Sequence, residues 1–174
     1  MFHKILVAMD TSAPAKDVFD EALFIAQASK ASLMLLHVLS GEEQSRQNIP
    51  VLPRKDYYPY PVMSKKTLEF NQEQWQALEK QGLELLQSRT DEATLAGVNT
   101  EFIQSPGNPG QTICNVARTW GADLIVVGRQ GLSGLSELAL GSVSNYVLYN
   151  ASCSVLTVQH LKNTESGEDE ASGS

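Results

Sequence analysis

The sequence is poor in cysteine and in basic residues. Cys114 and Cys153 are its two cysteines, and neither has a second Cys or His at the spacing of metal ligands, so we expect buried free thiols and no metal centre. Lys and Arg together number 13, against 20 Asp and Glu. This balance argues against binding to DNA, RNA or an anionic membrane, because such binding depends on clustered basic side chains.

Long apolar runs are also missing. The segment 1–4 leads into only five apolar residues before Asp10, fewer than the core of a signal peptide contains. No later run reaches the length that spans a bilayer. We therefore expect a cytoplasmic protein. Its hydrophobic content of 42% over 174 residues is enough for the core of one domain.

Five segments have the composition of β-strands. They are Lys4–Met9, Ser32–Leu39, Asn99–Ser105, Asp123–Val127 and Ser154–Val158. The first, second and fourth are almost wholly apolar, as expected for strands of a parallel sheet that is covered on both faces. The third alternates between apolar and polar residues, and we expect it at an edge of the sheet.

Four segments between these strands have helical periodicity. They are Ala15–Ala28, Lys66–Leu95, Pro109–Trp120 and Gly141–Asn150. Thr11 and Ser12 are residue types that cap helices, and Pro14 suits a first helical turn. Gly97 and Gly121 are expected to end the second and third helices.

The alternation of five strands with four helices predicts a single doubly wound α/β sheet of parallel strands. With the strand order 3-2-1-4-5, the ligand site is expected between the first strand, ending at Asp10, and the fourth, ending at Gly128. The predicted domain spans residues 1–160 and carries a long loop insertion, rich in Pro and Tyr, over residues 40–65. Residues 161–174 are acidic with almost nothing apolar, and we expect them to be disordered.

A glycine-rich segment follows the fourth predicted strand. Gly128–Gly131 reads G-R-Q-G, and after nine further residues Gly141–Ser144 begins the next helix with G-S-V-S. Glycines let the backbone approach a phosphate, and a helix N-terminus presents N–H groups and a partial positive charge. The hydroxyls of Ser142 and Ser144 would add donors, so the pattern indicates a phosphate site. The alternative is that the glycines only form tight turns and that Ser142 only caps the helix.

This spacing, G-x-x-G followed after nine residues by G-S, resembles the nucleotide-binding signature of the universal stress protein family. The resemblance covers nearly the whole chain, and four further segments carry it: K-I-L-V-A-M-D-T-S over 4–12, L-H-V over 36–38, G-N-P over 107–109 and G-A-D-L-I-V-V-G over 121–128. It implies an adenine nucleotide alpha hydrolase-like fold. It also implies a site for an adenine nucleotide such as ATP, ADP or AMP, either alone or with Mg or Mn.

The resemblance assigns the part of the site that holds the base and the sugar. Asp10 would lie beside the adenosine, and the main chain of Val38 would hydrogen-bond the adenine edge. Val127 would pack near the base. For Asp10, the residue type alone leaves an alternative, a carboxylate that only caps a helix or closes a turn.

The resemblance also assigns the part that holds the phosphates. Gly128 and Gly131 would admit the ribose and phosphates. Gly141, Ser142 and Val143 would bind the terminal phosphates. The complete predicted set is Ala8, Asp10, Thr11, Val38, Val127, Gly128, Arg129, Gly131, Gly141, Ser142, Val143 and Ser144.

By this resemblance the protein is a regulatory protein of the stress response, whose surface changes with nucleotide occupancy. Two other functions stay open: a slow ATPase or phosphotransfer enzyme, and a dimerising interaction module without nucleotide. An efficient enzyme is disfavoured, because no Walker A lysine follows Gly141 and Asp10 is the one candidate for a base. His3, His37 and His160 are isolated on or beside strands, and we expect them in the core or at the surface.

A second copy of the chain is the expected protein partner. Ser154–Val158 reads S-V-L-T-V and is expected at an edge of the sheet, where a bare apolar strand invites pairing with another chain. The resemblance likewise implies a homodimer through this strand, with the two copies antiparallel across a two-fold axis.

Overall fold

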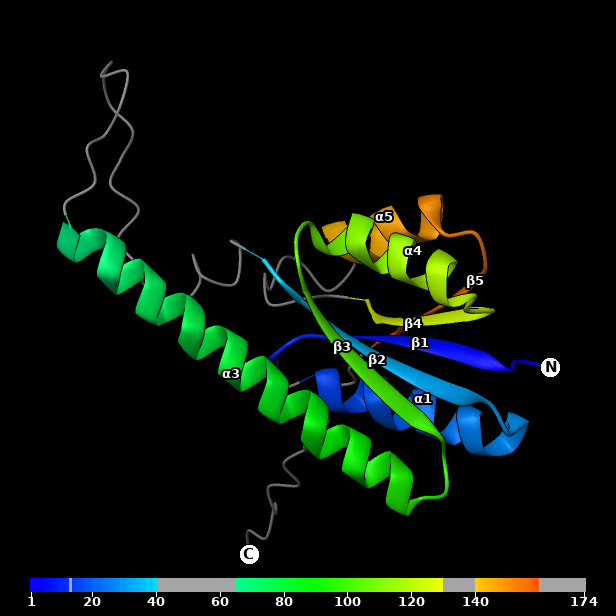
Figure 1. Cartoon of the computed structure of the whole chain (residues 1–174). Helices are drawn as coiled ribbons and strands as arrows, with labels where there is room; N and C mark the ends of the chain where they lie inside the picture. Colours follow the sequence, from blue (N-terminus) through cyan, green and yellow to red (C-terminus); the bar gives the residue numbers. More distant parts are fainter. Residues whose placement is uncertain (13, 41–64, 130–139, 160–174) are drawn as a thin grey trace, which may run out of the picture.

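The computed structural model describes residues 1–12, 14–40, 65–129 and 140–159, with residues 65–71 described by their backbone alone. Parallel strands form one sheet with the order β3-β2-β1-β4-β5, and helices lie on both of its faces (Figure 1). The strands are β1 (Lys4–Met9), β2 (Ser32–Leu39), β3 (Thr100–Pro106), β4 (Leu124–Gly128) and β5 (Ser154–Val158). The helices are α1 (Ala15–Ser29), α3 (Lys65–Leu95), α4 (Pro109–Trp120) and α5 (Ser142–Asn150). The predicted doubly wound α/β fold and its strand order are therefore confirmed.

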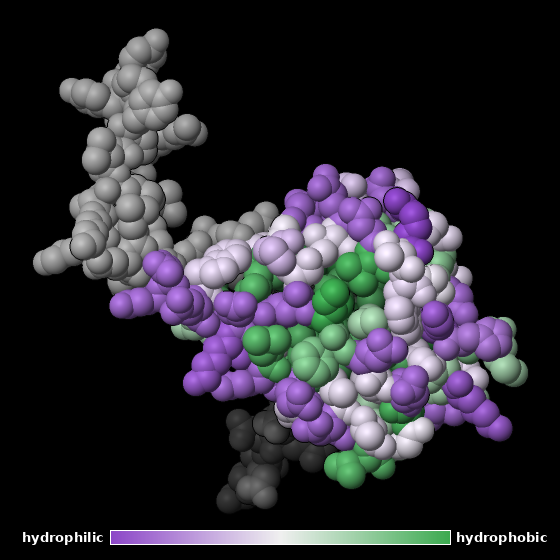
Figure 2. Space-filling view, viewed as in Figure 1, coloured by the Kyte–Doolittle hydropathy of each residue, from purple (hydrophilic) through white to green (hydrophobic). Residues whose placement is uncertain are grey.

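The bounds of β1, β2, α4 and β5 are those predicted. α1, α3 and α5 differ from their predicted bounds by one residue at one end, and β3 and β4 each begin and end one residue later than predicted. β3 lies at one edge of the sheet, and its residues alternate between half-buried and exposed over its first four positions, as expected for an edge strand. Figure 2 shows a hydrophobic area in the middle of the face that carries β3, bordered by hydrophilic residues. On this strand the side chain of Ile103 is 40% exposed.

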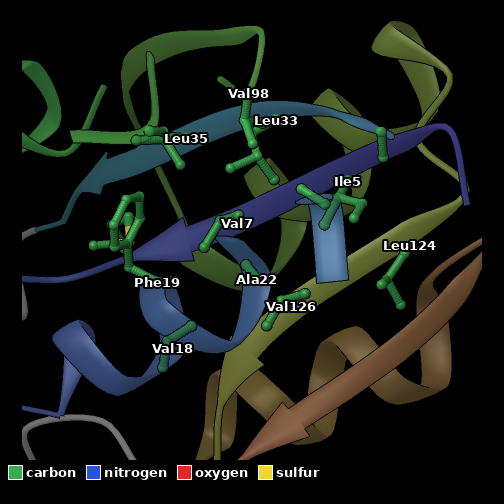
Figure 3. Close-up of a cluster of buried hydrophobic side chains, with 14 of the residues drawn as sticks. Ile5, Val7, Val18, Phe19, Ala22, Leu33, Leu35, Val98, Leu124 and Val126 are labelled. Atoms are coloured by element: carbon green, nitrogen blue, oxygen red, sulfur yellow. The ribbon is translucent and has the colours of Figure 1, made fainter. Parts of the chain in front are cut away.

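α1 and α3 cover one face of the sheet. Alternate residues of β1, Ile5 and Val7, point to this side and pack with Phe19 of α1 and Leu86 of α3 in one buried cluster. Figure 3 shows Val7 and Ile5 above Ala22, Phe19 beside Val7, and Leu33 and Val98 at the side of β2. This apolar layer fixes the position of β1 at the centre of the sheet, because β1 is buried on both faces.

α4 and α5 cover the other face. The intervening residues of the central strands, Leu6 of β1, Leu36 of β2 and Ile125 of β4, pack there with Ile113 of α4 and Val147 of α5. All of these side chains are almost completely buried. The two-residue period of a strand thus supplies both apolar layers from the same short segments.

The helix ends differ in how well they were predicted. α4 begins with Asn108, whose side-chain oxygen accepts the N–H of Gln111 at 3.2 Å, and it ends at Gly121 in the left-handed conformation, as predicted (φ 75°). The caps expected for α1 are wrong. Its N-cap residue is Pro14, which provides no side-chain hydrogen bond, and Ser12 instead hydrogen-bonds Asp10.

Asp123 closes the amino edge of the sheet, opposite the expected ligand site. Its carboxylate accepts the N–H of His3 at 2.8 Å and the N–H of Lys4 at 3.1 Å. The ammonium group of Lys4 donates to the carbonyl of Trp120 at 3.0 Å and lies 5.0 Å from the centre of its ring. These contacts join the start of β1 to the segment between α4 and β4.

The remaining structural predictions have mixed outcomes. Both cysteines are free; Cys114 is buried as expected, whereas Cys153 is half-buried, and burial raises the pKa of both thiols. In the part of the chain that the structure describes, no helix combines the length and the apolar character needed to cross a membrane. Of the predicted loop over 40–65, residues 41–64 lie outside the described residues, and Lys65 is the first residue of α3. The predicted tail over 161–174 and His160 also lie outside the described residues.

Candidate functional site

The two strands expected to flank the ligand separate before either of them ends. The pairing of β1 with β4 stops at Val7 and Val126. β1 then continues to Met9 and β4 to Gly128, while each stays paired with its other neighbour, β2 and β5. The two main chains therefore diverge at the carboxyl edge of the sheet, which is where doubly wound sheets bind their ligands.

The strand order arranges the predicted residues in a row along this edge. Val38 lies at the end of β2, Asp10 follows β1, and Gly128 and Arg129 lie at the end of β4. Neighbouring strands are about 4.8 Å apart, so β2 and β4, with β1 between them, are about 10 Å apart. A nucleotide that lay across β1 could therefore contact both of these strands.

Asp10 closes the turn that follows β1. Its Oδ1 accepts the N–H of Ser12 at 3.0 Å, and the hydroxyl of Ser12 donates to the same oxygen. Asp10 and Thr11 are both half-buried in this turn. The turn carboxylate considered as an alternative is thus present, and it does not exclude a ligand contact, because a carboxylate has two oxygens that accept hydrogen bonds.

Val38 lies one residue beyond His37, the last residue of β2 that pairs with β1. On its other side, β2 remains paired with β3 as far as Leu39, and the N–H of Gly107 then donates to the Leu39 carbonyl at 3.0 Å. The main chain of β2 at Val38 is therefore still paired with β3, although its pairing with β1 has already ended. Its side chain is 8% exposed and packs in the α4 layer.

Arg129 connects the end of β4 with β5 and with the start of α5. Its N–H donates to the carbonyl of Val158 at 2.7 Å, and its own carbonyl accepts the N–H of Gly141 at 2.8 Å. Its guanidinium group donates to the side-chain oxygen of Gln159, the residue after β5, at 2.7 Å. These hydrogen bonds place the first turn of α5 beside the carboxyl end of β4.

α5 begins with a glycine cap. Gly141 is the N-cap residue, in an extended conformation (φ −61°, ψ 156°), so the proposed capping by the Ser142 side chain is not what the structure shows. Ser142 is exposed, and Val143 is half-buried. Because glycine has no side chain that could accept from the first N–H groups of the helix, these donors and the helix dipole can act on an anion.

Ser144 has a different environment from Ser142. It is 1% exposed, and its hydroxyl oxygen lies 2.9 Å from the carbonyl oxygen of Arg129 and 3.0 Å from that of Gly141. Its proton can be donated to either carbonyl. In this structure Ser144 therefore holds the glycine cap of α5 against the end of β4.

The structure gathers most of the predicted site residues at this edge, while Gly131 lies outside the described residues. Ala8 is half-buried on β1, and Val127 is 4% exposed on β4. The contacts of Ser12, Gly107 and Gln159 were missed. Gln159 could not be found from spacing, because its proximity to Arg129 depends on the register of β4 and β5.

A metal site can be considered for the described residues alone. Among the ranges 1–12, 14–40, 65–129 and 140–159, no group of three or more His, Cys, Asp or Glu side chains is placed to hold a metal ion. The donors that the structure does assemble at the carboxyl edge are N–H groups and hydroxyls, which suit an anionic ligand.

Comparisons with known proteins agree with this architecture. The model of the universal stress protein family matches residues 1–159. The chain belongs to the universal stress protein family. It is 36% identical over 159 residues to the universal stress protein Sll1388 of Synechocystis, covering 91% of this chain and 99% of that one. It is 35% identical over 164 residues to YxiE of Bacillus subtilis, covering 91% and 100%.

Solved structures of universal stress proteins have the same fold. The protein UspA from Lactobacillus plantarum is 26% identical with a TM-score of 0.70, covering 90% of this chain and 97% of that one. A universal stress protein in complex with cAMP is 24% identical with a TM-score of 0.61, covering 90% and 97%. A family member from Arabidopsis thaliana with AMP bound is 22% identical with a TM-score of 0.58, covering 91% and 92%.

Proposed function

We propose that this universal stress protein binds an adenine nucleotide at the carboxyl edge of its sheet and acts as a nucleotide-dependent regulator of the stress response in the cytoplasm. One observation carries the proposal. The hydrogen bond from the Gly141 N–H to the Arg129 carbonyl puts a glycine-capped helix N-terminus beside the point where β1 and β4 diverge. The N-terminus of a helix, a structure that can bind anions, thus lies at the edge where doubly wound sheets bind their ligands, and this supports the proposal.

In this proposal the phosphates lie at the start of α5. The N–H groups of Ser142 and Val143 and the hydroxyl of Ser142 donate to them, and Gly128 and Gly131 allow close approach of the main chain. Ser144 acts indirectly, because its hydroxyl is occupied by the carbonyls that it joins. A divalent cation such as Mg or Mn would add charge neutralisation on the phosphates when bound.

The sugar and the base extend from there across β1. Asp10, with Ala8 and Thr11 beside it, lies between the phosphate side and the base side, and its carboxylate can accept from a ribose hydroxyl. Val127 packs near the adenine. The main-chain N–H and C=O at Val38 meet the edge of the base, at the end of β2 where pairing with β1 has ceased.

The main-chain N–H and C=O of Val38 would distinguish adenine from guanine by their hydrogen-bonding pattern. Adenine offers an acceptor at N1 beside a donor at its exocyclic amine, which match a backbone N–H and C=O. Guanine presents the reverse pair, so a donor would face the backbone N–H and an acceptor would face the backbone C=O. An unpaired buried polar group costs roughly 1–3 kcal/mol, which corresponds to about a tenfold to hundredfold loss of affinity.

The ligands of related proteins support an adenine nucleotide as the class. One structural neighbour was solved in complex with cAMP and another with AMP bound, and both share the fold over about nine-tenths of this chain. These identities are below 25%, so the support is for the class of ligand that this fold accepts. The glycines of the sequence and the glycine N-cap of α5, which has no side-chain cap hydrogen bond, are this chain's own contribution to the argument.

Calorimetry with ATP, AMP and GTP tests the proposal. We expect the wild type to bind ATP and AMP more tightly than GTP, and Gly141→Val to abolish phosphate-dependent binding by blocking close approach of the backbone. The extended conformation of Gly141 is open to any residue, so the variant should fold, and Gly141→Ala provides the graded control. Equal affinity for GTP and ATP would contradict the Val38 contact, and unaltered ATP binding by Gly141→Val would contradict the phosphate site.

We also propose that the protein is a homodimer through β5. This strand lies at an edge of the sheet, and its residues Val155, Leu156 and Val158 are half-buried within the chain. Pairing with a second copy would satisfy the outer row of main-chain groups and complete the burial of these side chains.

A further inference from the structure

We infer that Gly107 is a positioning residue for base selectivity, because it fixes the main chain of β2 at the place where the base is read. The inference rests on the proposed adenine contact at Val38. It concerns the G-N-P segment over 107–109, to which the proposed function assigns no role. The structure gives this segment a defined set of contacts with both β2 and α4.

Gly107 closes the pair formed by β2 and β3. The register of these strands ends with Leu39 opposite Pro106, and the N–H of Gly107 then donates to the Leu39 carbonyl at 3.0 Å. Val38 directly precedes Leu39 and is itself in register with Ser105. This hydrogen bond is therefore the last one that holds the β3 side of β2 beside the proposed base edge.

The conformation of Gly107 admits no other residue without strain. Its φ is 143°, which L-residues rarely adopt. A Cβ atom at this position would also lie 2.8 Å from the hydroxyl oxygen of Thr112 in the first turn of α4. A side chain at position 107 must therefore displace either this turn or the N–H that binds Leu39.

The following residues tie Gly107 to α4. The side chain of Asn108 accepts the N–H of Gln111 at 3.2 Å, and its carbonyl accepts the N–H of Thr112 at 2.9 Å. Gly107 thus lies between a capped helix and the end of β2, and a shift at this residue reaches the main chain of Val38. Hydrogen-bond readout of a base depends on positions held to about 0.5 Å, so such a shift weakens discrimination.

The test compares base selectivity with phosphate binding. In calorimetry on the full chain, we expect Gly107→Ala to reduce the ratio of ATP to GTP affinity by about tenfold, the effect of one compromised buried hydrogen bond. Binding of inorganic tripolyphosphate, which has no base, should stay unchanged. The double variant Gly107→Ala with Thr112→Ala removes the atom that the new Cβ would meet, and we expect it to recover part of the selectivity.

Matched controls are available at the amino ends of the strands, opposite the proposed site. Gly97 and Gly121 also have positive φ values, 82° and 75°, and a Cβ atom there would meet nothing within 4 Å. Gly97→Ala and Gly121→Ala should therefore reproduce the backbone strain and keep the wild-type ratio. If Gly107→Ala does not fold, Asn108→Ala loosens the same turn, and we expect a smaller loss of selectivity in the same direction.

Three results would overturn the inference. One is a folded Gly107→Ala or Asn108→Ala protein with the wild-type ratio of ATP to GTP affinity. Another is an equal loss of selectivity in Gly97→Ala, which would show a general effect of strain. The third is a wild type that binds no adenine nucleotide, in which case the proposed function fails as well. If the wild type binds ATP more tightly than GTP and the Gly107→Ala protein keeps the same ratio, only this inference is rejected and the proposed function stands.

Discussion

The side-chain nitrogen of Gln104 on β3 lies 2.9 Å from Nδ1 of His37, a residue of β2 that is 1% exposed. The same nitrogen donates to the carbonyl of Glu79 in α3 at 3.1 Å. An amide nitrogen is a donor, so it can hydrogen-bond Nδ1 of His37 when this ring nitrogen acts as the acceptor. One glutamine thus joins both neighbouring strands to α3 at the residue before Val38.

We expect Gly82→Ala to destabilise the protein because of this arrangement. A Cβ atom at Gly82 of α3 would lie 2.2 Å from the amide nitrogen of Gln104 and 2.4 Å from Nδ1 of His37. Glycine to alanine normally stabilises a helix by about 1 kcal/mol, but overpacking a buried site costs about 1–3 kcal/mol. Urea unfolding should therefore show a net loss, and the exposed Ser88→Ala of the same helix should show a slight gain. A Gly82→Ala protein as stable as the wild type would contradict the packing at His37.

The packing of Gly82 could not be predicted from the sequence. The apolar runs of β1 and β2 and the glycine that ends α4 were predictable, because burial on both faces and glycine caps leave direct traces in the sequence. Gly82 lies within a predicted helix and gives no such trace, since its neighbours Gln104 and His37 come from other elements. The same holds for Arg129 and Gln159, whose contact depends on strand register.

The start of α1 differs from the capping that the sequence predicts. Ser12 precedes Pro14 as a helix cap would, yet its hydroxyl donates to Asp10. The carboxylate of Asp10, two residues earlier and directly after β1, binds the Ser12 hydroxyl and its N–H in a turn that lies before the helix. The glycine spacing singled out the end of β4 and the start of α5, which the structure joins through Arg129 and Gly141, whereas it did not distinguish the exposed Ser142 from the buried Ser144.

Asp123 should make the stability of the protein depend on pH. Burial raises the pKa of its carboxyl, but the N–H groups of His3 and Lys4 and the His3 side chain outweigh this effect, so the pKa lies below its ordinary value. A depressed pKa in the folded state means that the stabilisation is present above the unfolded pKa, about 3.9, and is lost as the pH falls through the folded pKa.

We therefore expect Asp123→Asn to unfold more easily than the wild type at pH 7, with a difference that shrinks as the pH falls below the unfolded pKa and through the folded-state pKa of Asp123. Hydrogen bonds to a charged group contribute about 1.5–3 kcal/mol, and we discount this to about 1 kcal/mol because the carboxylate is 38% exposed. Thermal unfolding from pH 2 to pH 8 measures the difference, and Asp91→Asn on α3 serves as the exposed control. A deficit independent of pH would show that the charge of Asp123 does not matter.

The two serines of α5 should have opposite effects on stability and binding. Ser144→Ala removes the buried hydroxyl that reaches the carbonyls of Arg129 and Gly141, and we expect a loss of about 1–2 kcal/mol in unfolding free energy. Ser142→Ala changes an exposed side chain and should leave stability within about 0.5 kcal/mol of the wild type while weakening ATP binding. Denaturation and calorimetry on both variants separate these roles. The reverse pattern would exchange the assignments of the two residues.

The proposed dimer predicts that Val155→Lys produces a monomer. Val155 is a half-buried residue of the edge strand β5 that packs partly against the layer of α4 and α5, and a lysine at this position would bring a charge to the edge where a second copy must pack. Ile103→Lys is the matched control, because it introduces the same charge on β3 at the other edge of the sheet. Sedimentation at micromolar concentration should show a dimer for the wild type and for Ile103→Lys. A monomeric wild type, unchanged by Val155→Lys, would refute the interface.

The last prediction concerns turnover, which we expect to be low. Hydrolysis of a nucleotide needs an in-line nucleophile with a positioned base, and P-loop enzymes also place a lysine on the terminal phosphates. Gly141 is followed by Ser142 and not by the lysine of a P-loop, and the carboxylate of Asp10 already accepts two hydrogen bonds from Ser12. A residue engaged in its own turn is poorly placed to activate water, so bound ATP should persist.

Phosphate release from ATP in the presence of Mg or Mn measures this rate. The binding-deficient Gly141→Val variant, purified in the same way, gives the background from contaminating enzymes. We expect the wild type to exceed this background only slightly, and Asp10→Ala to change ATP affinity more than the rate. A metal-dependent rate on the order of 1 per second or more, lost in Asp10→Ala, would make the protein an enzyme with Asp10 as its base and would refute the regulatory role as the main function.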